Sequence, residues 1–409
     1  MINICLLFGI FPTTLKKQIE SQSKGAVQYA ADAFQKSIIA GISSYYDDVY
    51  IINLPFLSSY PKYYNKILAP SADIKGETDM VSGISLSYLN LPLLKFLSKE
   101  RRAYQELKNW GANVTGEKIV IVYSAHSPLL KAAVRYRNTI DKNTKILLIV
   151  PDLPEYMAHN RNFIVDQLKK IDMRSLWSLY NDVDGFVVLT EYMKEKLPIK
   201  SKPYEIIEGI FNPQDQPVLE LSSRKSIFYS GTLAKRYGVM TLVNSFIKAD
   251  LKDYVLEICG MGDSKDEIIK LASLYPNIHY YGQLPREKVL QIQRAATLLV
   301  NPRTPEGEFT KYSFPSKVME YLASGVPTLM YKLPGIPDEY YDYCYCITEL
   351  GEDALVNQLK MIINKPPTEL KQLGEKAQEF ILNEKNPISQ CSKISTLINE
   401  VLDNSVVKM

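Results

Sequence analysis

Short apolar runs alternate with amphipathic helical patterns along most of this 409-residue chain. The runs are near-continuously apolar, and the segments between them, such as 27–42 and 128–139, have the period of helices. Strands of this kind are buried on both faces, as in a parallel sheet that helices cover on either side. The strand candidates of the first half are Ile2–Phe8, Val49–Leu54, Lys118–Tyr123, Lys145–Val150 and Gly185–Leu189.

The same alternation starts again after residue 212. A polar segment that carries two prolines, 212–225, precedes it and is typical of a linker. Because one domain usually has ~100–200 residues, we expect a Rossmann-like domain at 1–212 and a second at 213–386. A final helix at 387–409 either completes the second domain or crosses back to the first. The strand candidates of the second half are Ser226–Ser230, Tyr254–Cys259, Ile278–Tyr281, Thr297–Val300 and Thr328–Tyr331.

Composition excludes several classes of function. Lys and Arg number 48 and Asp and Glu 45, so no strong basic field favours nucleic acid. The five cysteines are scattered and include no pair of CxxC units, which argues against structural zinc.

Targeting signals are equally sparse. Without a secretory signal or an apolar run of ~18 residues, we expect a cytoplasmic protein. The basic amphipathic stretch 91–110 fits either a solvated helix or peripheral contact with an anionic membrane.

The most informative segment is FPSKVMEYLASGVP at 314–327. Pro315 suits a first helical turn, and Gly325 suits a left-handed stop, which predicts a helix of about three turns. Its first turn carries unpaired N–H groups and a partial positive charge, to which Ser316 and Lys317 add a hydroxyl and a cation. The pattern therefore predicts a phosphate site at this end of the helix.

Two further features complete a nucleotide pattern. Glu320 lies one turn beyond Ser316, where its carboxylate could accept two hydrogen bonds from a sugar diol. The segment SGTLAKRYG at 230–238 follows the first strand of the second half, where ligands bind in open α/β sheets. Lys235 and Arg236 in that segment could neutralise a pyrophosphate. Surface positions for all of these residues remain an alternative.

In order and spacing, these motifs resemble the donor-binding domain of GT-B-fold glycosyltransferases, specifically the retaining family 4 group that builds bacterial polysaccharides. The resemblance implies two Rossmann-like doubly wound domains that face each other across a cleft. The first half resembles the family at 11–12, Gly25, 124–126 and 151–156. In the second half the matching segments are GFVVLT at 185–190, IIEGI at 206–210, YSG at 229–231, CGMG at 259–262, YGQL at 281–284, VNP at 300–302 and the helix motif at 315–327.

The resemblance also implies roles for individual residues. Glu320 matches the glutamate that binds the donor ribose, while Ser316 and Lys317 match the helix tip that meets the diphosphate. Lys235 and Arg236 stand in for the basic pair that holds the pyrophosphate. The remaining donor-side positions are Gly25, Gly231, Thr232, Gln283 and Leu284, of which Gln283 and Leu284 would lie against the nucleobase.

The sequence departs from the family pattern at three positions. Tyr312 stands where the family has a glutamate that touches the donor sugar, and Glu306 and Glu308 in the preceding loop could replace it. Thr232 and Tyr237 stand where the family has an arginine and a lysine. The identity of the sugar therefore does not follow from the resemblance.

Catalytic groups are few. In the family, the departing phosphate is thought to assist the incoming hydroxyl, so the enzyme mainly positions substrates and stabilises charge. His126 and Asp152 follow strands of the first half and are the candidates for orienting or deprotonating an acceptor hydroxyl. A turn histidine and a capping aspartate are the alternatives. Glu155 is a further candidate on the acceptor side.

No metal or redox cofactor is expected. Asp182 and Asp184 mimic the DxD metal motif but precede a strand, which favours a plain helix–strand connection. The segment 260–265 begins like a dinucleotide fingerprint but ends in Lys265 where a small residue should pack.

The sequence thus predicts a hexosyltransferase that uses a UDP- or GDP-linked sugar and a saccharide or lipid-linked acceptor. We expect the donor on the second half and the acceptor on the first. A nucleotide-sugar epimerase or hydrolase on the same fold, and a non-catalytic nucleotide-sugar-binding partner, remain alternatives.

Overall fold

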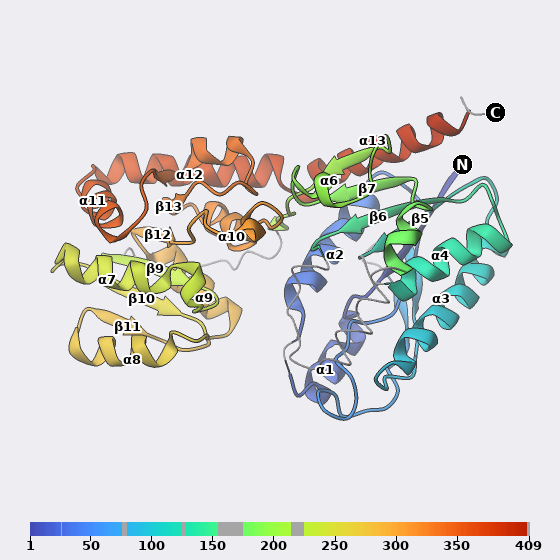
Figure 1. The fold of residues 1–409 in the computed structure, drawn as a ribbon, viewed down its shortest axis with the longest axis horizontal. Helices are drawn as coiled ribbons and strands as arrows, with labels where there is room; N and C mark the ends of the chain where they lie inside the picture. The colour runs from blue at the N-terminus through green and yellow to red at the C-terminus, as the bar shows by residue number, and fades with distance from the viewer. Residues whose placement is uncertain (26, 76–79, 125–126, 154–174, 214–224, 407–409) are drawn as a thin grey trace. The chain divides into compact units, whose positions relative to one another are not determined.

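A computed structural model describes residues 1–409 except 26, 76–79, 125–126, 154–174, 214–224 and 407–409 (Figure 1). The chain divides into two compact units. The first comprises Met1–Ile210 together with Pro387–Met409, and the second comprises Phe211–Asn386.

The first unit is built on an eight-stranded sheet in the order β3-β4-β2-β1-β5-β6-β7-β8. Neighbouring strands are parallel except β3 and β4, which form an antiparallel hairpin. The strands are β1 (Ile2–Phe8), β2 (Val49–Asn53), β3 (Ala72–Lys75), β4 (Val81–Ser85), β5 (Glu117–Tyr123), β6 (Lys145–Val150), β7 (Gly185–Val188) and β8 (Tyr204–Ile206). The helices include α1 (Thr13–Gln22), α2 (Tyr29–Ile42), α3 (Leu94–Asn113), α4 (Ser127–Thr139), α6 (Met193–Lys196) and α13 (Pro387–Val406).

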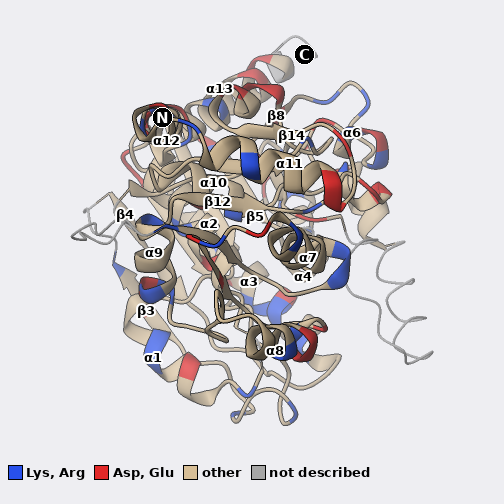
Figure 2. Ribbon diagram, turned by 90° about the vertical axis from the view of Figure 1, so that its left-hand side faces the viewer, with Lys and Arg blue, Asp and Glu red and all other residues tan. Residues whose placement is uncertain are grey.

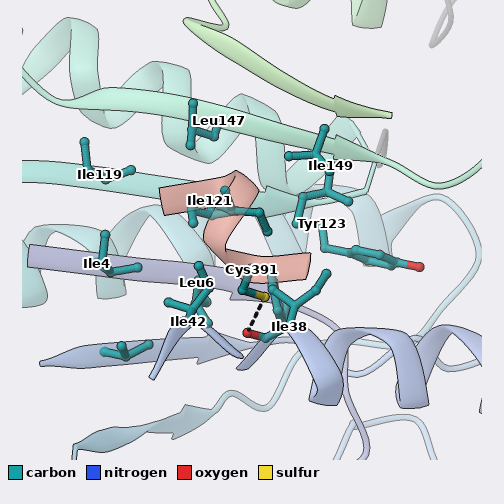
Figure 3. Close-up of a cluster of buried hydrophobic side chains, with 14 of the residues drawn as sticks. Ile4, Leu6, Ile38, Ile42, Ile119, Ile121, Tyr123, Leu147, Ile149 and Cys391 are labelled. Carbon is teal, nitrogen blue, oxygen red and sulfur yellow. Dashed lines mark hydrogen bonds between the residues drawn. The ribbon is translucent and has the colours of Figure 1, made fainter. Parts of the chain in front are cut away.

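The C-terminal helix α13 belongs to the core of this first unit. Its buried side chains pack with those of α2 against one face of the sheet, as Figure 3 shows around Cys391. The Cys391 thiol donates to the carbonyl of Ile38 at 3.7 Å. A Cβ on Gly41 would lie 2.3 Å from the carbonyl oxygen of Pro387, so glycine permits the close approach of the two helices. The residues that α13 buries there are Cys391, Ile394, Leu397, Ile398 and Val401.

The second unit is a parallel sheet in the order β11-β10-β9-β12-β13-β14. Helix α7 shows how a sequence period becomes packing, since Val239, Leu242, Val243 and Phe246 are buried on one face. The strands are β9 (Ser226–Ser230), β10 (Val255–Cys259), β11 (Ile278–Tyr280), β12 (Leu298–Asn301), β13 (Thr328–Tyr331) and β14 (Tyr345–Ile347). The helices are α7 (Val239–Ala249), α8 (Lys265–Leu274), α9 (Arg286–Ala295), α10 (Lys317–Ala323), α11 (Glu352–Ile363) and α12 (Pro367–Glu384).

Charges of both signs are mixed along the chain, as helices α1 and α8 show in Figure 2. This distribution agrees with the formal net charge of +3. Any site for a charged ligand must therefore be built locally.

Candidate functional site

The order of strands in the second unit defines where a ligand would bind. The chain proceeds from β9 to β10 and β11 on one side, and from β12 to β13 and β14 on the other. The point between β9 and β12 is therefore the topological switch point, where loops at the carboxyl ends of the strands diverge and ligands bind. Ser230 ends β9 and Asn301 ends β12, so the segments that follow them border this point.

Lys317, the first residue of α10, lies at this edge of the sheet. Its Nζ donates to the Tyr229 hydroxyl at 3.1 Å and stands 4.2 Å from the centroid of the same ring. The Tyr229 hydroxyl in turn donates to the carbonyl of Thr232 at 2.9 Å, which fixes the ring beside the loop after β9. A Cβ on Gly231 would lie 2.6 Å from Nζ, so glycine leaves the space that the ammonium group occupies.

Two arginines extend this positive region. Arg303, two residues beyond β12, is buried, and its guanidinium carbon lies 5.4 Å from the Tyr237 ring centroid and 4.8 Å from that of Phe309. The guanidinium of Arg236 lies 5.0 and 5.7 Å from the same two rings. We call Lys317, Arg303 and Arg236, with the rings of Tyr229, Tyr237 and Phe309, the cation–aromatic cluster.

The electrostatics of the cluster favour an anion. Burial and, to a smaller extent, the charge of Arg303 lower the pKa of Lys317 to about 7, although the carboxylate of Glu320 offsets part of the shift. Burial and the charge of Arg236 also lower the pKa of Arg303. Nε of Arg303 is buried without a hydrogen-bond partner, while its Nη2 donates to Ser313 at 2.8 Å. A bound polyanion would relieve this mutual repulsion, so the arrangement suits a diphosphate.

Arg303 is a candidate site residue that the sequence interpretation missed. The signal was its position three residues after the end of the predicted strand at 297–300. Recognising it would have required the order of the strands, because only two of the six strand ends border the switch point.

Glycines bring the loops of this edge into close contact. A Cβ on Gly260, which follows β10, would lie 1.8 Å from the carbonyl oxygen of Gly231. The N–H of Gly231 donates to the Cys259 carbonyl at 3.0 Å, and the N–H of Gly260 donates to the Gly282 carbonyl at 2.8 Å. The loops after β9, β10 and β11 are thus held as one layer.

Tyr321 and Glu320 lie on the same short helix with different partners. The hydroxyl of Tyr321, which is fully buried, accepts the N–H of Ser230 at 2.8 Å and so ties α10 to the end of β9. Glu320 is half-exposed, and its carboxylate accepts from Arg286 at 3.1 Å. Its carboxylate oxygens are therefore accessible but already accept one hydrogen bond.

The first turn of α10 differs from the predicted one. The helix begins at Lys317 rather than Pro315 and has seven residues. The N–H of Val318 donates to the Pro315 carbonyl at 2.9 Å, so Pro315 and Ser316 form a tighter turn ahead of the helix. Ser316 is exposed and makes no side-chain cap.

The structure separates Lys235 from Arg236. The two residues are consecutive in a short 3₁₀ turn, Lys235–Tyr237, and point to different neighbours. Nζ of Lys235 lies 3.7 Å from the Glu267 carboxylate on α8, and the backbone N–H of Lys235 donates to Asp263 Oδ1 at 2.9 Å. Of this predicted basic pair, only Arg236 joins the cation–aromatic cluster.

The remaining donor-side candidates occupy varied positions. Tyr312 is buried, and its hydroxyl donates to Glu308 at 3.3 Å. Leu284 packs against the buried cluster around Phe228, whereas Gln283 is exposed. Thr232 and Glu306 are also exposed.

The acceptor-side candidates are less fully described. Asp152 follows β6, where desolvation raises the pKa of its carboxyl group, and its charge contributes to the raised pKa of Tyr123 at the end of β5. Gly25 is exposed beside the Tyr63 ring. His126 and Glu155 lie outside the described residues.

The DxD-like pair is engaged in the fold. Arg137 donates to Asp182 Oδ1 at 2.8 Å and to Asp184 Oδ2 at 3.3 Å. The N–H of Ile146 also donates to Asp184, at 2.8 Å. Both carboxylates therefore anchor α4 to the ends of neighbouring strands.

No group of three or more His, Cys, Asp or Glu side chains among the described residues is placed to hold a metal ion. Within the same residues, no helix has the length and apolar character needed to cross a bilayer.

Comparisons with known proteins agree with this architecture. The chain is similar to sucrose-phosphate synthase from Thermosynechococcus elongatus, with a TM-score of 0.66, 14% identity and coverage of 98% of this chain and 100% of that one. It is also similar to the trehalose-6-phosphate synthase OtsA, with a TM-score of 0.65, 12% identity and coverage of 97% of this chain and 98% of that one. A third match is HepE of Anabaena in complex with UDP, with a TM-score of 0.60, 12% identity and coverage of 97% of this chain and 100% of that one. A search of curated proteins finds no significant match.

Residues 212–380, which contain the cation–aromatic cluster, match the family model described as "Glycosyl transferases group 1". The second unit therefore carries a glycosyl transferases group 1 domain, in a chain with the GT-B fold of glycosyltransferases.

Proposed function

We propose that this protein transfers a hexosyl group from a nucleoside diphosphate sugar to a saccharide or lipid-linked saccharide, with retention, in the synthesis of a cell-surface polysaccharide. The observation that carries the proposal is the cation–aromatic cluster at the switch point of the domain that matches the group 1 family. A neighbour of the same fold in complex with UDP supports a nucleoside diphosphate as the ligand.

In this proposal Lys317, Arg303 and Arg236 hold the diphosphate. Negative charge grows on the diphosphate as its bond to the sugar breaks, so fixed cations favour the transition state over the ground state. The departing phosphate oxygen takes the proton of the incoming hydroxyl, whose oxygen forms the new bond to the sugar, and the protein contributes position and electrostatics. Asp152 and His126 are proposed to orient the acceptor.

A stepwise assay tests the reaction. Nucleotides are first screened by thermal shift, since a ligand that binds only the folded state raises the melting temperature. Sugars linked to the best nucleotide are then incubated with and without a saccharide or lipid extract. Transfer that requires the extract supports the proposal. Turnover without it would indicate a hydrolase or epimerase, and binding without any turnover would indicate a non-catalytic partner.

We expect Glu320→Ala to weaken binding of UDP or GDP by about 1–3 kcal/mol, because a ribose diol would lose two hydrogen bonds to a charged acceptor. Isothermal titration measures the change. Glu287→Ala is the matched control, since Glu287 is an exposed glutamate on α9. Equal affinities of the Glu320 variant and the parent protein would remove the ribose role.

We also expect binding of a nucleotide sugar to weaken as the pH rises above about 7. The free protein holds Lys317 at a pKa of about 7, so above that pH its amine is neutral and must take up a proton to pair with the diphosphate. Below that pH it is already charged, and affinity levels off. A nucleotide sugar is the better ligand because a free terminal phosphate titrates itself near pH ~6.

Titrations from acid to alkaline pH, in buffers of different ionisation enthalpy, measure both the affinity and the proton uptake. The variant Lys317→Met should show a flat profile. A parent protein that is equally flat would exclude Lys317 as the titrating group.

A further inference from the structure

Exposed aliphatic side chains of the first unit gather where the segment after β2 meets the start of α3. The N–H of Asn90 donates to the Ile67 carbonyl at 2.7 Å, and Leu68 forms an isolated bridge with Leu89, so the two segments lie side by side. Leu97, Leu93 and Leu68 are 67%, 58% and 55% exposed. We call the group the aliphatic surface; its members are Ile67, Leu68, Leu93, Leu94 and Leu97.

The backbone of this surface presents one leucine in an unfavourable conformation. Leu93 has φ 64° and ψ −52°, and the N–H of Leu94 donates to the Pro92 carbonyl at 2.8 Å. This is a γ-turn whose central residue has positive φ, a geometry that is strained for any residue with a Cβ. A glycine would relieve the strain, so the leucine at this exposed apex has no explanation in local folding.

Exposed cations flank the aliphatic surface. Segments 54–72 and 80–99 contain no Asp or Glu. Both carry lysines, although Lys99 in the second segment is buried. Lys62 and Lys66 are exposed, and Arg101 is exposed one turn beyond Leu97 on α3. Glu100 is the acidic residue of α3 that lies nearest to Leu97 in sequence, and Glu106, further along the helix, accepts the Tyr50 hydroxyl at 2.8 Å.

The segments that form the aliphatic surface follow the carboxyl ends of two strands of the sheet. Strands β2 and β4 are parallel, so both end at the same edge, and the segments that build the surface follow these two ends. Ligands of open α/β sheets bind at this edge.

We propose that the aliphatic surface docks on an anionic lipid bilayer. Exposed leucine and isoleucine side chains with flanking cations and few carboxylates have the composition of a membrane-surface contact, in which apolar groups enter the interface and cations meet anionic headgroups. Tyr63, exposed with Lys62 Nζ 4.9 Å from its ring centroid, is of the residue type that membrane interfaces favour. Docking would bring the carboxyl edge of this sheet to the headgroups. This membrane contact is a separate property from the transfer reaction.

Vesicle flotation tests the docking surface directly. The full chain is mixed with vesicles of phosphatidylcholine, or of phosphatidylcholine with phosphatidylglycerol, at low and high salt. We expect binding to the anionic vesicles that weakens with salt. The variant Leu93→Ser/Leu97→Ser should lower the partition coefficient at least about tenfold, because two apolar side chains are lost from the interface. The variant Lys62→Ser/Lys66→Ser should weaken binding and its dependence on salt.

Two controls separate docking from folding. Ile269→Ser/Leu274→Ser removes two exposed aliphatic side chains from α8 and should leave vesicle binding unchanged. Leu93→Gly should keep or raise the melting temperature, because it relieves the positive φ, and yet reduce vesicle binding.

Three results would overturn the proposal. They are equal partition of the parent protein and the Leu93→Ser/Leu97→Ser variant, equal binding to neutral and anionic vesicles, and self-association without lipid that this double variant abolishes. Because flotation needs no nucleotide, each result is independent of the transfer reaction.

Discussion

Replacing Lys317 by Met is expected to weaken binding of a nucleoside diphosphate roughly 10- to 150-fold, because a hydrogen bond to a charged group contributes about 1.5–3 kcal/mol. Methionine keeps most of the side-chain volume next to Tyr229 but removes the ammonium group that donates to its hydroxyl. Isothermal titration with UDP and GDP, at a pH below 7 where the parent amine is charged, gives the largest contrast.

The matched control for this substitution is Lys235→Met, in which a lysine of the same domain is lost. Nζ of Lys235 lies beside Glu267 rather than in the cation–aromatic cluster, so we expect a change in affinity of less than about threefold. Arg303→Gln should resemble the Lys317 variant, since it removes a second cation of the cluster. Equal effects of the Lys235 and Lys317 substitutions would show that net charge, rather than the cluster, governs binding.

Ten of the fourteen described strands could be predicted from the sequence, because burial on two faces leaves a continuous apolar run. Strands at 2–8, 145–150, 226–230 and 328–331 have the predicted bounds, and others differ by one or two residues. The β3–β4 hairpin and the edge strands β8 and β14 were not predicted, because these short strands are only partly buried and lack such runs.

The candidate site could be predicted only in part. Lys317, Gly231 and Glu320 follow from local patterns at a strand end and a helix start. Arg303 does not, because its importance depends on β12 pairing with β9, which is a tertiary event.

The start of α10 also depends on tertiary packing. A Cβ on Gly335 would lie 2.5 Å from the Thr310 carbonyl oxygen and 2.6 Å from that of Ser313, so the segment ahead of α10 is pressed against the loop after β13. This packing sets the path by which the chain enters the helix. The local conformational propensities of Pro315 and Ser316 do not predict this path.

Replacing Gly260 by Ala is expected to lower the free energy of unfolding of the second unit by about 3–5 kcal/mol, which is among the largest effects of a single substitution. Gly260 has φ 138°, and its added Cβ would lie 1.8 Å from the carbonyl oxygen of Gly231. Because this contact is with the backbone, the loop after β9 would have to move, and Gly231 would move away from Lys317. We therefore expect nucleotide binding to fall together with stability.

Calorimetry is the suitable measurement for this substitution, because Trp110 and Trp177, the two tryptophans of the chain, both lie in the first unit and their fluorescence would not report on the second. Gly282→Ala is the matched control: Gly282 has φ 68°, but nothing lies within 4 Å of its added Cβ. Only the backbone cost of about 1–2 kcal/mol should then appear. If the two substitutions destabilised the protein equally, positive φ alone would explain both, and the close approach of Gly260 to Gly231 would have no part in supporting the site.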